Sequence, residues 1–242
     1  AHVRRESRHV LADEQTEDLE AAQLVSKVES SIKVFFDAKN PEQLIPLCRQ
    51  AERVGPMIRS HYSAKPVHEG SVREIRSLQP LTLDDRGNFW AAVVLLDSGR
   101  NKNLLLEIMD SGEVRVDWET LVCHQPMDWD QFAVQRPAGT SMDFRVYAEQ
   151  DNFHSHEFSN ADQWTCFRLT TLAGDETLFG YVPAGDPMEK QLLSALQRNR
   201  GRKLAVILRL IVPEGLKSRR GVVIEKISCE RWIYVDPPDS GS

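Results

Sequence analysis

The spacing of apolar residues divides the chain into a helical first part and a longer part in which apolar and polar positions alternate. From Thr16 onward, apolar side chains recur every three or four residues, which is the spacing of one helix face. This pattern predicts a long helix over residues 16–38 and a third helix over 51–62. Between them, Asn40 as cap and Pro41 at the first position open a short second helix.

After Pro66 the apolar period falls to two, which is typical of β-strands. Turn sequences rich in Asp, Ser, Gly and Asn separate the apolar runs. The predicted strands cover residues 72–83, 89–96, 104–109 and 114–119. We therefore expect an antiparallel sheet that follows three helices in the chain.

A second set of alternating segments begins after residue 140. It predicts strands at 144–149, 164–171, 177–182, 203–212 and 222–235. A helix that starts at Asp186-Pro187 separates the third of these strands from the fourth. A polar loop over 151–163 follows the first strand, and another loop over 213–221 precedes the last.

Pro126, Pro137 and Gly139 lie between the two sets of elements and indicate a domain boundary. The predicted organisation is a flexible segment at 1–15, a first domain at 16–138, a second at 139–235, and a tail at 236–242. The fold class is α+β, with a helix-covered, curved antiparallel sheet followed by a small β-barrel that carries one helix.

The first domain resembles the nuclear-transport-factor-like cone fold, a cystatin-like architecture shared with ketosteroid isomerases. The resemblance rests on the helix stripe at 28–36, the stretch 47–62, and the strands at 89–96, 104–109 and 114–118. The stretches 35–38 and 53–57 and the pair His61-Tyr62 are similar to a family of uncharacterised bacterial proteins with this fold. Cone domains often pair through their sheets, so the resemblance implies a homodimer.

The second domain is similar to an OB-fold, because three strands, a helix and two strands follow one another in that order. An SH3-like barrel is the alternative, but it leaves the helix after Asp186 unexplained.

Composition is that of an ordinary globular protein, with 41% hydrophobic and 27% charged residues and a net charge of -6. Charge is unevenly spread, because residues 198–231 hold 10 Lys and Arg against 3 Asp and Glu. This basic segment either meets an anionic partner or pairs with the acidic stretch at 139–197. No apolar run is long enough to cross a bilayer. An anchor or export signal ahead of the basic residues at 2–9, as in a membrane-tethered bacterial protein, is an expectation only.

The first candidate site is a ligand pocket in the cone. The residues expected to reach it are His61, Tyr62, Trp90, Asp117 and Trp118. A carboxylate in an apolar pocket has a raised pKa and can transfer protons. In the alternative interpretation, Asp117 and Arg115 lie on a solvated face and the Trp side chains fill the core.

The second candidate site is the barrel, where a single-stranded nucleic acid or an oligosaccharide would bind. The expected rings are Tyr147, Phe167, Phe179 and Tyr181, and the expected cations are Lys217, Arg219 and Arg220. In the alternative, the rings form the barrel core and the charges lie at loop tips. The acidic loop at 151–163 also opposes phosphate binding.

The remaining motifs predict no metal, cofactor or nucleophile. His154, His156 and Glu157 are metal-ligand types, but the further ligands that a site needs are missing. Four scattered cysteines form no zinc spacing. The sequence therefore favours a non-catalytic interaction or scaffold module with an unknown protein partner. Nucleic-acid or oligosaccharide binding by the barrel, and ligand binding or acid–base catalysis in the cone, are the alternatives.

Overall fold

The computed structural model describes residues 2–238 and has an α+β fold with two compact units. The first unit ends at Leu121 and the second begins at Val122. This boundary lies earlier than the expected one at 138/139, because Trp129 and Phe132 belong to the core of the second unit. Within the described residues, no helix combines the length and the apolar character that a membrane span requires.

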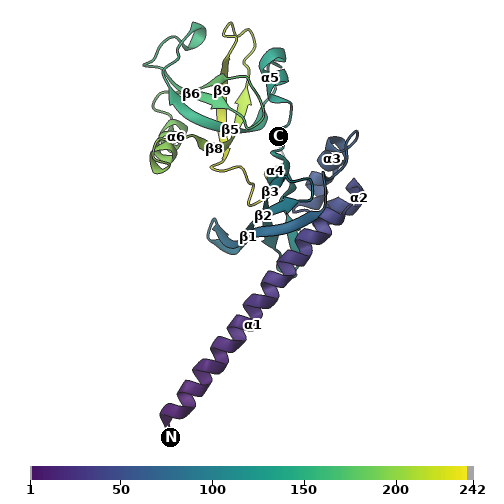
Figure 1. The fold of residues 1–242 in the computed structure, drawn as a ribbon. Helices are drawn as coiled ribbons and strands as arrows, with labels where there is room; N and C mark the ends of the chain where they lie inside the picture. Colours follow the sequence, from purple (N-terminus) through teal and green to yellow (C-terminus); the bar gives the residue numbers. More distant parts are fainter. Residues whose placement is uncertain (1, 239–242) are drawn as a thin grey trace. The chain divides into compact units, whose positions relative to one another are not determined.

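The first unit begins with the long helix α1 (His2–Asp37), whose N-terminal end extends beyond the sheet (Figure 1). Helix therefore replaces the flexible segment that was expected over residues 1–15, from His2 onward. Val28, Ile32 and Phe35 are buried at intervals of four and three residues, as the apolar period predicts. The C-terminal part of α1 is thus the part that packs.

Two hydrogen bonds stabilise the turn between α1 and the next helix. Oδ1 of Asn40 accepts from the Gln43 amide at 3.0 Å, and Oε1 of Gln43 accepts from the Lys39 amide at 2.8 Å. Asn40 therefore acts as the predicted cap. The helical elements that follow are α2 (Pro41–Leu44), the 3-10 turn η1 (Ile45–Leu47) and α3 (Ala51–His61).

The sheet of the first unit is antiparallel and has the strand order β1-β2-β3-β4. Its strands are β1 (Val72–Leu83), β2 (Arg86–Leu96), β3 (Asn101–Ile108) and β4 (Val114–Val116). The predicted strand at 114–119 is wrong after Val116, since helix α4 (Trp118–Val122) starts there. Oδ1 of Asp117 accepts from the Thr120 amide at 2.8 Å, which favours the helix start.

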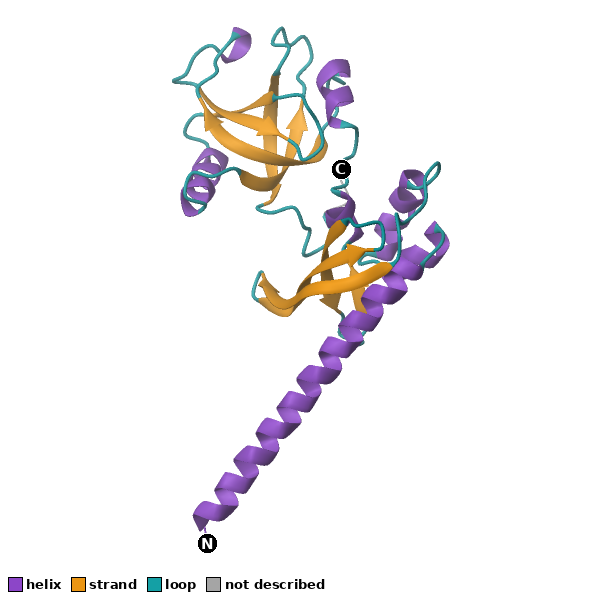
Figure 2. Ribbon diagram, in the orientation of Figure 1, coloured by secondary structure: helices purple, strands orange, loops and turns teal. Residues whose placement is uncertain are grey.

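The second unit is a closed five-stranded barrel with the order β5-β6-β7-β9-β8 (Figure 2). Strands β7 and β9 are parallel, and the other neighbours are antiparallel. The strands are β5 (Met142–Asp151), β6 (Trp164–Thr170), β7 (Leu178–Pro183), β8 (Leu204–Ile211) and β9 (Gly221–Cys229). The helical elements are α5 (Trp129–Gln135), the 3-10 turn η2 (His156–Phe158) and α6 (Pro187–Arg198).

Alternate positions of the strands fill the barrel, and Gly180 is one place where the packing requires glycine. A Cβ at Gly180 would lie 2.8 Å from the side chain of Ile224. The predicted last strand at 222–235 is wrong beyond Cys229. There the thiol of Cys229 donates to the Ile233 carbonyl at 2.8 Å, and Trp232 Nε1 donates to the Val146 carbonyl at 3.0 Å. The chain therefore turns back onto β5, and of the predicted tail only 236–238 lie within the described residues.

Candidate functional site

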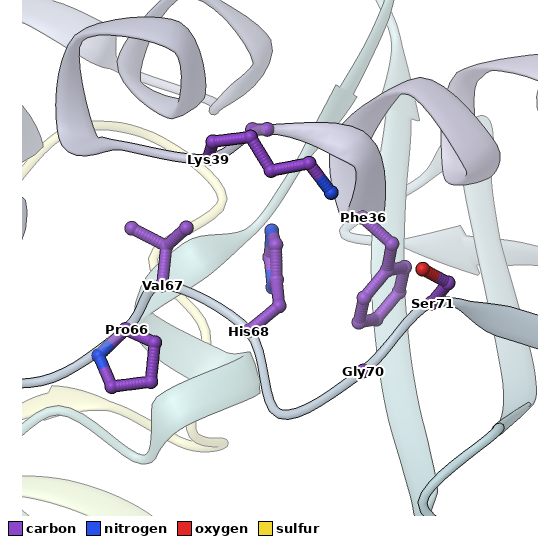
Figure 3. A pocket seen from close by; sticks show the side chains of 8 residues that line it. Phe36, Lys39, Pro66, Val67, His68, Gly70 and Ser71 are labelled. Atoms are coloured by element: carbon purple, nitrogen blue, oxygen red, sulfur yellow. The ribbon is translucent and has the colours of Figure 1, made fainter.

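A small pocket lies where the end of α1 meets the loop between α3 and β1 (Figure 3). Its volume is about 150 Å³. The residues that decide its chemistry are Phe36, Lys39, Pro66, Val67, His68 and Ser71. Most of these walls are apolar, while Lys39, His68 and Ser71 bring polar groups to them.

His68 is the central side chain of this pocket. Its Nε2 lies 2.8 Å from the Phe35 carbonyl and therefore donates to it, since a carbonyl oxygen can only accept. The ring also packs against Phe35 and Phe36, with centroids 5.2 and 4.8 Å away. Burial lowers the pKa of His68, which favours the neutral ring with an acceptor at Nδ1. Lys39 and Lys102 also lower this pKa, while the Phe35 carbonyl and Asp37 raise it.

Lys39 and Ser71 bring an ammonium and a hydroxyl to the lining of the pocket. The Lys39 side chain extends along the pocket above the rings of His68 and Phe36 (Figure 3). The amide of Ser71 donates to Oδ1 of Asp97 at 3.1 Å. A Cβ at Gly70 would lie only 2.0 Å from that same oxygen, so this close approach requires glycine. An ammonium and a hydroxyl beside apolar walls can together hold a small anion.

Three of the residues predicted for the cone pocket instead form an aromatic cluster. Nε1 of Trp118 donates to the Tyr62 hydroxyl at 3.2 Å, and the His61 ring meets Trp118 edge-on at 5.3 Å. Burial lowers the pKa of His61 and raises that of Tyr62. Trp90 and Trp118 are both buried, as the core interpretation expected. The His68 pocket is lined by other residues than these.

Asp117, the fifth predicted residue, is neither solvated nor a solitary carboxylate in an apolar pocket. It is 6% exposed, and its Oδ2 lies 2.6 Å from Nη1 of Arg49. Arg49 also contacts Oε2 of Glu107 at 2.6 Å, and Arg53 pairs with Glu119. Asp117 therefore lies in a buried ion pair, whereas the acid–base interpretation expected a carboxylate surrounded by apolar walls. Charged residues inside apolar stretches, such as Glu107 within 104–109, were the sequence signal for this ionic cluster.

The rings predicted as a stacking surface on the barrel are covered. Phe167 and Tyr181 are fully buried, and Phe179 is 8% exposed. Phe167 lies in the barrel core, whereas Phe179 and Tyr181 belong to a second apolar cluster. Tyr147 packs against Trp232, with centroids 4.5 Å apart. The prediction of exposed rings is therefore wrong for Phe167, Phe179 and Tyr181, because the core and the chain's own side chains cover them.

The predicted cations Lys217, Arg219 and Arg220 are exposed in the loop before β9. Elsewhere the basic segment pairs with the acidic stretch before it: Arg209 contacts Asp143 at 2.9 Å and Lys203 contacts Glu149 at 3.8 Å. The pairing interpretation therefore holds for these two cations.

His154 and Glu157, in the loop after β5, form hydrogen bonds with backbone groups of the protein. A ring nitrogen of His154 lies 3.0 Å from the Phe158 carbonyl, and the Glu157 carboxylate accepts from the amides of Lys217 and Ser218. Across residues 2–238, no group of three or more His, Cys, Asp or Glu side chains is arranged to hold a metal ion. The four cysteines are free thiols.

Comparison of the chain with known protein families, curated proteins and solved structures finds no significant match.

Proposed function

We propose that the chain is a binding protein built from a nuclear-transport-factor-like cone unit and an OB-like barrel unit. Support for the barrel comes from its closed five-stranded order and from helix α6 between the third and fourth strands. Support for the cone comes from three α-helices ahead of an antiparallel sheet. Because such folds serve many purposes, the function has to be argued from the site.

The proposed ligand of the first unit is a carboxylate on a short apolar stem, bound in the His68 pocket. The observation that carries this proposal is the combination of the Lys39 ammonium and the Ser71 hydroxyl with apolar walls. The volume of about 150 Å³ is below the several hundred Å³ of pockets for drug-sized ligands. The pocket therefore suits a small carboxylic acid or one acidic side chain of a partner protein.

Titration of the protein with propionate, followed by amide chemical shifts, tests the proposal. We expect shifts around residues 66–71, and loss of most binding in Lys39→Met because its ammonium is removed. Lys33→Met, which removes an exposed lysine of α1, is the matched control and should bind as the unmodified protein does. Equal binding by all three proteins would refute the anion site.

A second titration uses a short peptide that is capped at both ends and contains one Glu. It distinguishes a free carboxylic acid from an acidic side chain of a partner protein. Stronger binding of the peptide than of propionate favours a partner protein, and the reverse order favours a free acid. Light scattering of the same samples measures whether the chain forms the homodimer that we propose from the cone resemblance.

A further inference from the structure

The N-terminal half of α1 carries an acidic stripe. Residues 9–26 hold five Asp and Glu and no Lys or Arg. Asp13, Glu17 and Glu20 follow one another at steps of four and three residues, so they share one face of the helix. Leu24, four residues further on, begins the apolar part of the same face, which packs on the sheet. The face that α1 buries in its own unit is therefore acidic where the helix extends beyond that unit.

The acidic part of α1 lies outside the packed part of the first unit. Toward its N-terminus the helix continues away from the sheet (Figure 1). Residues 19–23, the first whose side chains the structure describes, are all exposed. An isolated helix is only marginally stable in water, and most helical stability in proteins comes from packing of one face. A surface that covers the acidic stripe would stabilise this helix, and such a surface has to be cationic.

The second unit offers a cationic surface in the loop between α6 and β8. Residues 198–203 hold four exposed cations and no acid. The four are Arg198, Arg200, Arg202 and Lys203. Among the described residues, only the first and the last of them form ion pairs, with Glu230 at 3.2 Å and with Glu149 at 3.8 Å. Arg200 and Arg202 are therefore available to an anionic partner.

The backbone that carries these cations is fixed at the end of α6. The amides of Arg200 and Gly201 donate to the carbonyls of Gln197 and Leu196, each at 3.0 Å, in the Schellman motif that ends many helices. Arg200 has a φ of 56°, a left-handed conformation that glycine adopts more readily, so an arginine here has a conformational cost. A preformed loop loses less conformational freedom when a partner binds.

A pocket of about 380 Å³ lies beside this loop. Its apolar lining residues are Ala195, Leu204 and Ala205. Arg198 and Lys203 line it as well, so the pocket combines apolar walls with cations. A helix with an apolar residue and acids on one face complements such a surface. In α1, Val10 lies three residues before Asp13 and therefore on the face of the acidic stripe.

From this complementarity we propose that α1 of a second copy of the chain binds the barrel, with its acidic stripe on the loop at 198–203. Each copy gives its helix to the barrel of the other, so a twofold axis relates the two contacts and the dimer is closed. Two contacts are made at once, which offsets the small contribution of each exposed ion pair. No sheet takes part, so this dimer differs from the one that the cone resemblance implies. The proposal is also independent of the His68 pocket.

Sedimentation velocity at low and at high salt tests the proposal. We expect a dimer at low salt and a monomer at high salt, because salt screens exposed charges. Arg200→Glu with Arg202→Glu should weaken the dimer about tenfold or more, since like charges then face each other. Glu17→Lys with Glu20→Lys should weaken it in the same way from the helix side.

A variant that carries all four reversals should recover the dimer, because opposite charges face each other again. Arg219→Glu with Arg220→Glu makes the same change of charge in another exposed loop of the barrel, and this matched control should dimerise as the unmodified protein does. Circular dichroism checks that each variant is folded. If the helix reversal lowers the helix content, Glu17→Gln with Glu20→Gln replaces it and should also weaken the dimer, because it removes the anions without adding cations.

Three results would overturn the proposal. The first is a monomer at low salt. The second is a dimer that both reversals leave intact, which is the behaviour of a dimer paired through the cone sheets. The third is loss of the dimer in both reversals without recovery in the fourfold variant, because the two surfaces would then not bind each other.

Discussion

Arg49 donates from Nε to Oε2 of Glu107 across 2.6 Å, and both side chains are nearly excluded from solvent. The contact joins the segment before α3 to strand β3. The same guanidinium reaches Asp117 and lies 5.1 Å over the Phe89 ring. One cation thus neutralises two buried carboxylates, of which Glu107 lies in strand β3 and Asp117 directly precedes helix α4.

Arg49→Met should strongly destabilise the first unit. The substitution leaves Glu107 and Asp117 buried without this cation, and breaking a buried pair in this way costs about 3–5 kcal/mol. Urea unfolding at neutral pH measures the loss. Arg59→Met removes an exposed arginine that pairs with Glu42, and it should change the midpoint little. Similar effects of the two variants would show that the buried cluster is unimportant for stability.

Asp143 should stabilise the second unit in a pH-dependent way. Burial acts to raise the pKa of Asp143, but hydrogen bonds from Arg209, Tyr234 and Ser228 together lower the pKa below its ordinary value. The contribution of ionised Asp143 to the stability of the second unit is therefore complete above the pKa of about 3.9 in the unfolded state. It is lost as pH falls through the lower pKa of the folded state.

The variant Asp143→Asn tests this. Its urea midpoint should be below that of the unmodified protein at pH 7, and the two midpoints should converge in acid. Asp162→Asn, an exposed acid of the same unit, is expected to keep the midpoint of the unmodified protein at pH 7. A constant gap between the Asp143→Asn variant and the unmodified protein at all pH values would contradict the linkage.

His68 should destabilise the folded chain when it is protonated. Burial lowers its pKa, so the unfolded state binds the proton first as pH falls below about 6.5. Stability therefore decreases between that pH and the lower folded pKa, and levels off below it. The side-chain resonances of His68 should titrate below about 6.5, and His68→Gln should reduce the slope of stability against pH. A titration above 6.5 would contradict the assigned environment.

The thiols of Cys48 and Cys166 should resist alkylation in the folded protein. Burial raises the pKa of Cys48 to about 12 and that of Cys166 to about 11, so little thiolate exists at pH 8. Iodoacetamide followed by peptide mass spectrometry should find both unmodified after a time that suffices to modify them in urea. Equal rates in the two conditions would contradict their burial.

Local pattern predicted most of the elements but not where two of them end. The apolar period located α3 and the barrel strands, because burial of one face imposes that period on any sequence. The same period predicted that the strand from Val114 continues past Asp117. Alternation alone does not reveal that the Asp117 carboxylate caps a helix. It also extended β9 beyond Cys229, where the turn depends on contacts with β5. Of the candidate residues, the exposed Lys217, Arg219 and Arg220 were placed correctly on a loop, whereas Asp117 was not recognised as a partner of Arg49.

By itself, the sequence determined the α+β class and the order of helices and strands, because periodicity and turn chemistry act between near neighbours in the chain. Only the tertiary structure decided which groups meet. The approach of His68 to the Phe35 carbonyl, the pairing of Arg49 with Glu107 and the stacking of Phe158 on Tyr181 join residues that are separated by 33, 58 and 23 positions. Such contacts follow from how packed elements exclude water, and no short-range pattern in the chain records them.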